Sequence, residues 1–215
     1  MKDFCIVSDF DGTISKKDGL YTFISRYAKG DWQKIEQDWT LGKISSKECL
    51  VKEFELIPNL TEDLVLNFVS SLEIDDYFVK FYEYVTQNNI DFYIVSDGID
   101  YFIAKILYKY GLEDMKIISN HGEFVNKTFK ISFPNDSPKC INNAGTCKCN
   151  VLETLRRKYK KIYYIGDGVS DFCVSNKPDI LFAKSKLAAY CKQQNTDYEE
   201  FEAFDDILKY FSGLN

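Results

Sequence analysis

The sequence contains little proline, little glycine and no long apolar segment. Four prolines and eleven glycines in 215 residues, with 45% apolar and 28% charged residues, exclude a collagen, a repeat array and a disordered tail. No apolar run reaches the roughly 18 residues that a membrane span needs, and acidic residues come too early after the start for a signal peptide. We therefore expect a cytoplasmic globular protein, one domain or one domain with an insertion, and no membrane partner.

Positive charge is in the minority. The chain has 27 Lys and Arg residues against 33 Asp and Glu residues, which gives a formal net charge of −6 at pH 7. Binding to a nucleic-acid backbone depends on a basic surface that displaces counterions from phosphates. The charge therefore predicts a small-molecule partner and no nucleic acid, and it leaves the oligomeric state undefined.

The seven cysteines do not have the pattern of a disulfide framework or of a zinc site. Their number is odd, and Cys5 lies in an apolar run where it is expected to behave as a small hydrophobic residue. Cys140, Cys147 and Cys149 have the spacing C-x6-C-x-C, with no nearby histidine and no C-x2-4-C pair. We predict reduced thiols and assign no role to these three.

Short apolar runs alternate with helical patterns along most of the chain. Such strands, buried on both faces, are typical of a parallel sheet with helices on both sides, so the predicted class is α/β with a Rossmann-like sheet. The predicted helices cover residues 100–110, where Gly111 follows, and 149–158. The predicted strands are residues 4–8, 92–96, 116–119, 162–165 and 180–182.

Two segments depart from this alternation. No strand pattern is present between Ile14 and Gln87, which predicts four or five helices and a helical cap of residues 15–87 inserted into a core of residues 1–14 and 88–215. Residues 123–133 place apolar and aromatic residues around Asn-Lys, which predicts a hairpin at the edge of the sheet.

Acidic residues follow the first and fourth predicted strands. Asp9 and Asp11 come directly after the first strand, and Gly12 lets the chain turn behind them. Asp167 and Asp171 follow the fourth strand. Because ligands bind beyond the carboxyl ends of parallel strands, these carboxylates are expected in one crevice, where oxygen ligands suit Mg²⁺. Taken alone, each motif could instead be a turn with a helix cap.

Ser96, Gly98 and Lys148 are candidates for binding a phosphoryl group in the same crevice. Ser96 and Gly98 follow the second predicted strand and offer a hydroxyl and an exposed N–H group. Lys148 precedes the helix that leads to the fourth strand. A single lysine is usually a solvated surface charge, so its assignment depends on the other motifs.

Together these residues resemble the four motifs of the haloacid dehalogenase superfamily: DFDGT at 9–13, Ser96, Lys148 and GDGVSD at 166–171. The helical insertion resembles the cap of the first structural subclass, which includes phosphoserine phosphatases, and implies the strand order 3-2-1-4-5. Within that subclass, the sequence most resembles phosphatases of 2-hydroxy-3-keto-5-methylthiopentenyl phosphate in methionine salvage. It also resembles phosphatases of phosphocholine, phosphoethanolamine and pyridoxal phosphate.

The resemblance implies a phosphomonoesterase that depends on Mg²⁺. Asp9 would attack phosphorus and form an aspartyl-phosphate, and Asp11 would protonate the leaving oxygen and then deprotonate water. Mg²⁺ would be bound by Asp9, by the backbone carbonyl of Asp11 and by Asp167.

The remaining motif residues would support this reaction. Ser96, the N–H of Gly98 and the ammonium of Lys148 would hold the phosphoryl oxygens. Asp171 would orient Lys148 or the water molecules around the metal. The substrate would be a small phosphorylated metabolite.

The cap would determine which substrate is accepted. Asp18 and Tyr21 are the candidates for contact with the leaving group. Arg26 is the only arginine in the cap, and no clear partner for the carboxylate of phosphoserine is evident in the sequence. This argues against phosphoserine as the substrate. Two other classes remain: a receiver-type phosphoacceptor module, disfavoured by the insertion and by GDGVSD, and a phosphotransferase that passes the phosphoryl group to an acceptor other than water.

Overall fold

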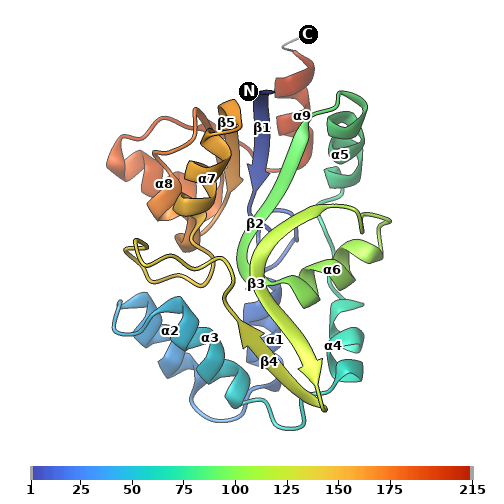
Figure 1. Cartoon of the computed structure of the whole chain (residues 1–215), viewed down its shortest axis with the longest axis vertical. Coiled ribbons are helices and arrows are strands. Elements are labelled where there is room, and N and C mark those ends of the chain that lie inside the picture. The colour runs from blue at the N-terminus through green and yellow to red at the C-terminus, as the bar shows by residue number, and fades with distance from the viewer. Residues whose placement is uncertain (1, 214–215) are drawn as a thin grey trace.

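The computed structural model describes residues 2–213 and has a seven-stranded sheet with helices on both faces (Figure 1). The order is β4-β3-β2-β1-β5-β6-β7, with β3 and β4 antiparallel and the other neighbouring pairs parallel. No helix within these residues has the length and apolar character of a membrane span. The strands are β1 (Lys2–Ser8), β2 (Asp91–Ile99), β3 (Lys116–Val125), β4 (Thr128–Ser132), β5 (Tyr159–Gly166), β6 (Ile180–Ala183) and β7 (Glu199–Glu200).

The structure confirms the α/β class and the predicted strand order. The five predicted strands correspond to β1, β2, β3, β5 and β6, so their order is 3-2-1-4-5. The two predicted core helices are α6 (Asp100–Tyr108) and α7 (Lys148–Arg156). β7 was not predicted, because two residues are too few to form a pattern.

The central strand β1 shows why the sheet is buried on both faces. Ile6 belongs to the apolar core that includes α5, α6 and α9, whereas Cys5 and Val7 belong to the core beneath α7 and α8. All three side chains are fully buried. The alternation of a β-strand therefore supplies both cores from one short run. The helices that complete these layers are α8 (Ser185–Gln194) and α9 (Phe204–Ser212).

The segment between β1 and β2 is helical, as predicted. Ser15, near the start of this segment, pairs in an isolated bridge with Ile74, which precedes its last helix. Phe23 in this segment meets Phe102 of α6 with ring centroids 4.9 Å apart. The helices are α1 (Gly19–Tyr27), α2 (Trp32–Thr40), α3 (Ser46–Glu55), α4 (Glu62–Val69) and α5 (Phe78–Gln87).

The fifth helix of the insertion packs on the sheet. Phe78 of α5 contacts Phe204 of α9, and Phe81 of α5 contacts Phe92 of β2, with ring centroids 4.8 and 6.0 Å apart. We propose that the cap consists of α1 to α4, which gather at one end of the molecule in Figure 1, and that α5 belongs to the core. This proposal keeps the predicted start of the cap at 15 and moves its end from the predicted 87 to before Phe78.

The edge hairpin is formed by β3 and β4. Asn126 and Lys127 have φ angles of 50° and 65°, as a two-residue type I′ turn requires. Phe124 lies directly opposite Phe129 in the ladder, and their rings pack against each other. The predicted hairpin is therefore present, and its cross-strand aromatic pair stabilises it.

Candidate active site

The carboxyl ends of β1, β2 and β5 meet at one edge of the sheet, and the sequence motifs lie there. The N–H of Asp9 donates to the carbonyl of Ile165 in β5, which fixes the start of the loop after β1. Gly12 has a φ of +77°, and a Cβ at this position would lie 2.5 Å from Asp167 Oδ2. Only glycine lets the loop turn this closely against Asp167.

Lys148 connects the first and last motifs through two buried ion pairs. Its Nζ lies 2.9 Å from Asp9 Oδ2 and 2.6 Å from Asp171 Oδ1. The side chains of Lys148, Asp9 and Asp171 are at most 6% exposed. Burial alone would lower the pKa of Lys148, but the charges of Asp171 and Asp9 raise it above its usual value. Lys148 is therefore a charged, buried lysine.

Asp171 is fixed by four donors. Besides Lys148, the hydroxyl of Tyr164 donates to Asp171 Oδ1 at 2.6 Å. The backbone N–H groups of Asp167 and Gly168 both donate to Asp171 Oδ2 at 3.1 Å. Asp171 lies in the first turn of the short helix Val169–Val174 and accepts from the N–H groups at its start, and it also holds Lys148 in place. The helix-cap role and the functional role are therefore both present.

Asp11 lies on the side of the loop that faces the cap. Its Oδ1 accepts a hydrogen bond of 2.8 Å from the N–H of Gly19 in α1. Burial, and then the charge of Asp18, raise the pKa of Asp11 to about 8. A Cβ on Gly98 would lie 2.7 Å from Asp11 Oδ2, so β2 approaches this carboxyl group closely.

Ser96 and Gly98 lie together where the register between β2 and β3 shifts. The N–H of Gly98 donates to Ser96 Oγ at 2.9 Å. The two groups expected to contact separate phosphoryl oxygens are therefore bonded to each other in this structure. Ser96 is 1% exposed, so its hydroxyl lies within the closed part of the crevice.

The carboxylates of Asp9, Asp167 and Asp171 form a cluster in which Asp9 and Asp167 could hold a metal, because the oxygens of Asp171 already accept from four donors. One ligand atom of each lies within 4.8 Å of the others. A single Mg²⁺ binds oxygens at 2.0–2.1 Å, so its ligands lie within about 4.2 Å of one another, and a small shift would bring this all-oxygen set to that separation. Thr13 donates to Asp167 Oδ1 at 2.7 Å and fixes that carboxylate. The donor set fits a hard divalent cation.

A cavity of about 630 Å³ lies between the cap and the core. Lys148 and Ser170 line it on the core side, and Trp39 and residues 42–46 line it on the cap side. The loop before Lys148 forms a further wall, and Asp97 holds this loop by accepting a hydrogen bond of 2.9 Å from the N–H of Thr146. The cavity is large enough for a small metabolite.

The structure gives the two cap candidates local roles. Asp18 caps α1, because its Oδ1 accepts a hydrogen bond from the N–H of Tyr21 at 2.9 Å. Tyr21 is 50% exposed, and its ring packs edge-on against Trp32. Neither residue lines the cavity described above. Their contact with a leaving group remains a prediction.

The cysteines after the hairpin are free thiols, as predicted for all seven. Cys149 donates to the backbone carbonyl of Cys173 at 3.1 Å. Cys140 and Cys173 line the cavity next to Lys148. Tertiary structure therefore brings a further cysteine, Cys173, to this group.

Thr13, Tyr164 and Ser170 are site residues that the sequence reasoning missed. Ser170 Oγ accepts a hydrogen bond from Lys148 at 3.0 Å and lies 3.5 Å from Asp9 Oδ2. Thr13 and Ser170 are part of the motifs, so their hydroxyl groups were a usable signal. Tyr164 gave no signal, because a tyrosine within an apolar strand also matches an ordinary core residue.

Comparison with known proteins identifies the family. A family model described as Putative Phosphatase matches residues 4–199 of the chain. The chain belongs to this phosphatase family. The match spans both the motifs and the helical insertion, and with the named phosphatase relatives it confirms the predicted phosphoric monoester hydrolase over a receiver-type module.

Individual relatives agree with this assignment. The phosphatase is 31% identical to the 2-hydroxy-3-keto-5-methylthiopentenyl-1-phosphate phosphatase of Bacillus pumilus, over 100% of this chain and 93% of the relative. It is 27% identical to the protein of the same name from an Exiguobacterium species, over 98% of each chain. A solved structure of phosphoserine phosphatase with an analogue of the phospho-aspartyl intermediate shares the fold, with a TM-score of 0.72. The two sequences are 19% identical, over 98% of this chain and 99% of that one.

Proposed function

We propose that this phosphatase hydrolyses a small phosphorylated metabolite through an aspartyl-phosphate on Asp9, and that the metabolite is 2-hydroxy-3-keto-5-methylthiopentenyl-1-phosphate. The observation that carries the mechanism is the position of Asp9, buried at the end of β1 and 2.9 Å from Lys148. The relatives from Bacillus pumilus and Exiguobacterium carry the name of this substrate and support the choice.

The reaction takes place in two displacements. An oxygen of Asp9 forms a bond to phosphorus while the bond from phosphorus to the leaving oxygen breaks, and Asp11 donates a proton to that oxygen. Water then attacks the phosphorus of the aspartyl-phosphate, Asp11 takes its proton, and the bond to Asp9 breaks to release phosphate. The hydrogen bond from Gly19 of α1 to Asp11 supports this role, because it shows that this carboxyl group lies on the side of the loop that faces the cap.

Positive charge and donors at the strand ends stabilise the transferring phosphoryl group. Lys148 offers its ammonium to the oxygens of Asp9 and of the phosphoryl group, and Ser96 offers its hydroxyl. Asp9 and Asp167 would hold Mg²⁺, with the carbonyl of Asp11, and the ion would neutralise charge between the two anions when bound. Asp171 positions Lys148 through the contact at 2.6 Å.

The leaving group would occupy the cavity between cap and core. Its cap wall contains Trp39 and the uncharged residues 44–46, together with one basic and one acidic residue, Lys43 and Glu48. The guanidinium of Arg26 lies over the ring of Phe68, 5.8 Å from its centroid, so the single cap arginine packs within the cap. This arrangement favours the methylthiopentenyl substrate over phosphoserine.

A phosphate-release assay tests the proposal. We expect Mg²⁺-dependent turnover that EDTA removes, the highest kcat/KM for the methylthiopentenyl phosphate, and a loss of about 10⁴-fold or more in Asp9→Asn. The panel also contains phosphoserine, phosphocholine, phosphoethanolamine and pyridoxal phosphate. A higher kcat/KM for one of these would overturn the substrate, and transfer to an added alcohol in preference to water would identify a phosphotransferase.

A further inference from the structure

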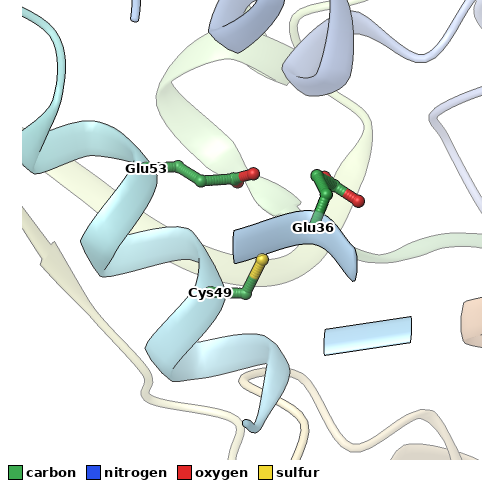
Figure 2. A group of neighbouring side chains, drawn as sticks. All are labelled: Glu36, Cys49 and Glu53. Carbon is green, nitrogen blue, oxygen red and sulfur yellow. The ribbon is translucent and has the colours of Figure 1, made fainter. Parts of the chain in front are cut away.

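A second cluster of possible metal ligands lies in the cap, apart from the strand ends. Cys49 and Glu53 are four residues apart on α3 and therefore project from the same face of that helix. Glu36 comes from the neighbouring helix α2. Figure 2 shows the side chains of Cys49 and Glu53 extending from α3 towards the segment that carries Glu36.

The geometry of this cluster is that of a small binding site. One ligand atom from each residue, the sulfur of Cys49 and an oxygen from each glutamate, lies within 4.8 Å of the other two. Cys49 and Glu53 are each only 4% exposed, and Glu36 is partly buried. The cluster is thus held inside the cap, unlike an acidic patch on a surface.

Glu53 has a buried oxygen that lacks a partner. Its Oε1 is inaccessible to solvent and has no hydrogen-bond partner within residues 2–213. A buried polar atom without a partner is costly, and native proteins seldom contain one unless a ligand, an ion or a water molecule satisfies it. Glu53 therefore points to an absent group at this position.

The charges around the cluster favour a cation as that group. Neither Glu36 nor Glu53 forms an ion pair within the part of the chain that the structure describes. Asp18 adds further negative charge near both glutamates, and the positive charge of Lys186 acts on Glu36 from a greater distance than an ion pair. A divalent cation would neutralise the two carboxylates at once.

We propose that Glu36, Cys49 and Glu53 bind a divalent cation of the zinc class, at a site separate from the Mg²⁺ site at the strand ends. A thiolate selects Zn²⁺ over Mg²⁺, and carboxylates complete a mixed set that zinc accepts. Zinc binds sulfur at about 2.3 Å and oxygen at 2.0–2.2 Å, so two ligands of one ion are at most about 4.5 Å apart. The observed cluster needs to contract by only a few tenths of an ångström.

The cation would join α2 to α3 and so stabilise the cap. Three protein ligands leave a fourth position of the tetrahedral ion for water. Cys49 loses its proton to solvent as its sulfur binds the metal. Because the ion binds the folded cap, it raises the melting temperature in proportion to the logarithm of its free concentration.

Co²⁺ binding to the full-length protein tests the site. With excess Mg²⁺ present, we expect one Co²⁺ per chain and a thiolate-to-cobalt charge-transfer band, which an all-oxygen site at Asp9 and Asp167 cannot produce. Zn²⁺ at about 100 times its Kd should raise the melting temperature by roughly 5 to 10 °C. Cys49→Ser should lose the band, and Glu36→Gln should weaken binding of Co²⁺ by at least tenfold.

Matched variants separate this site from the other thiols and from catalysis. Cys173→Ser, which alters the group near the cavity, should keep the band. Asp9→Asn, which we expect to be inactive, should also keep the band. A failure of the proposed catalytic function can therefore be distinguished from a failure of the proposed cap site. A band that persists in Cys49→Ser or disappears in Cys173→Ser would overturn the proposal. So would the absence of a band in wild-type protein, which would mean that the two glutamates share a proton.

Discussion

The strand ends around Asp9 and the cap both bury acidic side chains, but within residues 2–213 only the cluster at the strand ends has a cation, Lys148, in contact with them. At the strand ends, Lys148 contacts both Asp9 and Asp171, and backbone N–H groups bind the remaining oxygens of Asp171. In the cap, Glu36 and Glu53 face each other and the thiol of Cys49. Buried carboxyl groups therefore have different surroundings in the two regions: a lysine and N–H donors at the strand ends, and a second carboxyl group and a thiol in the cap.

This difference shows how each region tolerates its charge. A buried carboxylate is stable when a partner charge and hydrogen bonds replace the water that it loses, and the Lys148 network meets both conditions. A carboxyl group without such partners stays protonated or recruits a cation from solvent. Removal of one charge should therefore destabilise the fold strongly at the strand ends and have little effect on stability in the cap.

The largest effect is expected from Lys148→Met. This change leaves Asp9 and Asp171 buried beside each other without their cation, which should lower the free energy of unfolding by about 3 to 5 kcal/mol and abolish turnover. Urea unfolding followed by circular dichroism measures the loss. Lys209→Met on α9 is the control, because Lys209 is 70% exposed and should be replaced with almost no cost. A Lys148→Met protein as stable as wild type would show that Lys148 does not offset the burial of Asp9 and Asp171.

Asp171→Asn should have the next largest effect. The amide cannot accept from Lys148, Tyr164 and two N–H groups as the carboxylate does, so we expect a loss of about 2 to 3 kcal/mol in the free energy of unfolding. Turnover should also fall, because Lys148 loses one of its two anchors. An unchanged unfolding midpoint together with reduced turnover would show that Asp171 acts on the reaction alone.

Glu53→Gln is the matched change in the cap and should behave differently. The substitution keeps the size of the side chain and removes one of two opposing carboxyl groups, so in metal-free protein the free energy of unfolding should stay within about 1 kcal/mol of wild type. The same urea titration measures it. A loss as large as that of Asp171→Asn would mean that Glu53 has a stabilising partner and would remove the contrast between the regions.

The smallest effect is expected at His121, outside both regions. Its Nδ1 lies 2.7 Å from Asp100 Oδ2, and this hydrogen bond raises the pKa of His121 above 6.5, with Glu123 adding a weaker contribution. The pair stabilises the fold fully below about pH 6.5, and this contribution is lost as the pH rises through the raised pKa. Because both partners are exposed, it should be below about 0.5 kcal/mol.

A proton NMR titration measures the pKa of His121 directly, since the chain has a single histidine. The Asp100→Asn variant should return the pKa of His121 towards 6.5. A wild-type pKa at or below 6.5 would show that the contact with Asp100 does not form in solution.

Much of the fold followed from local patterns. The apolar run that forms β1 and the Asn-Lys turn of the hairpin were evident because strand burial and turn geometry depend on neighbouring residues. Local pattern does not decide the cap limit at 87, because α5 has the same amphipathic pattern as a cap helix and it is the contacts of α5 with α9 and β2 that associate it with the sheet.

The candidate site likewise has some features that the sequence predicts and others that it does not. Asp9, Asp11 and Asp167 were predictable because short motifs place them directly after strands. The bond from Gly98 to Ser96 and the hydroxyl of Tyr164 on Asp171 were not predictable, because each depends on the angle at which one side chain or loop enters the crevice.

The sequence by itself determined the α/β alternation, the helical insertion and the residues at each strand end, since these depend on residue type and spacing within a few positions. Only the tertiary structure decided that Lys148 lies between Asp9 and Asp171, and that Glu36 meets Cys49 and Glu53. The physical reason is that such contacts join segments far apart in the chain, and their geometry is set by the packing of helices and strands against one another.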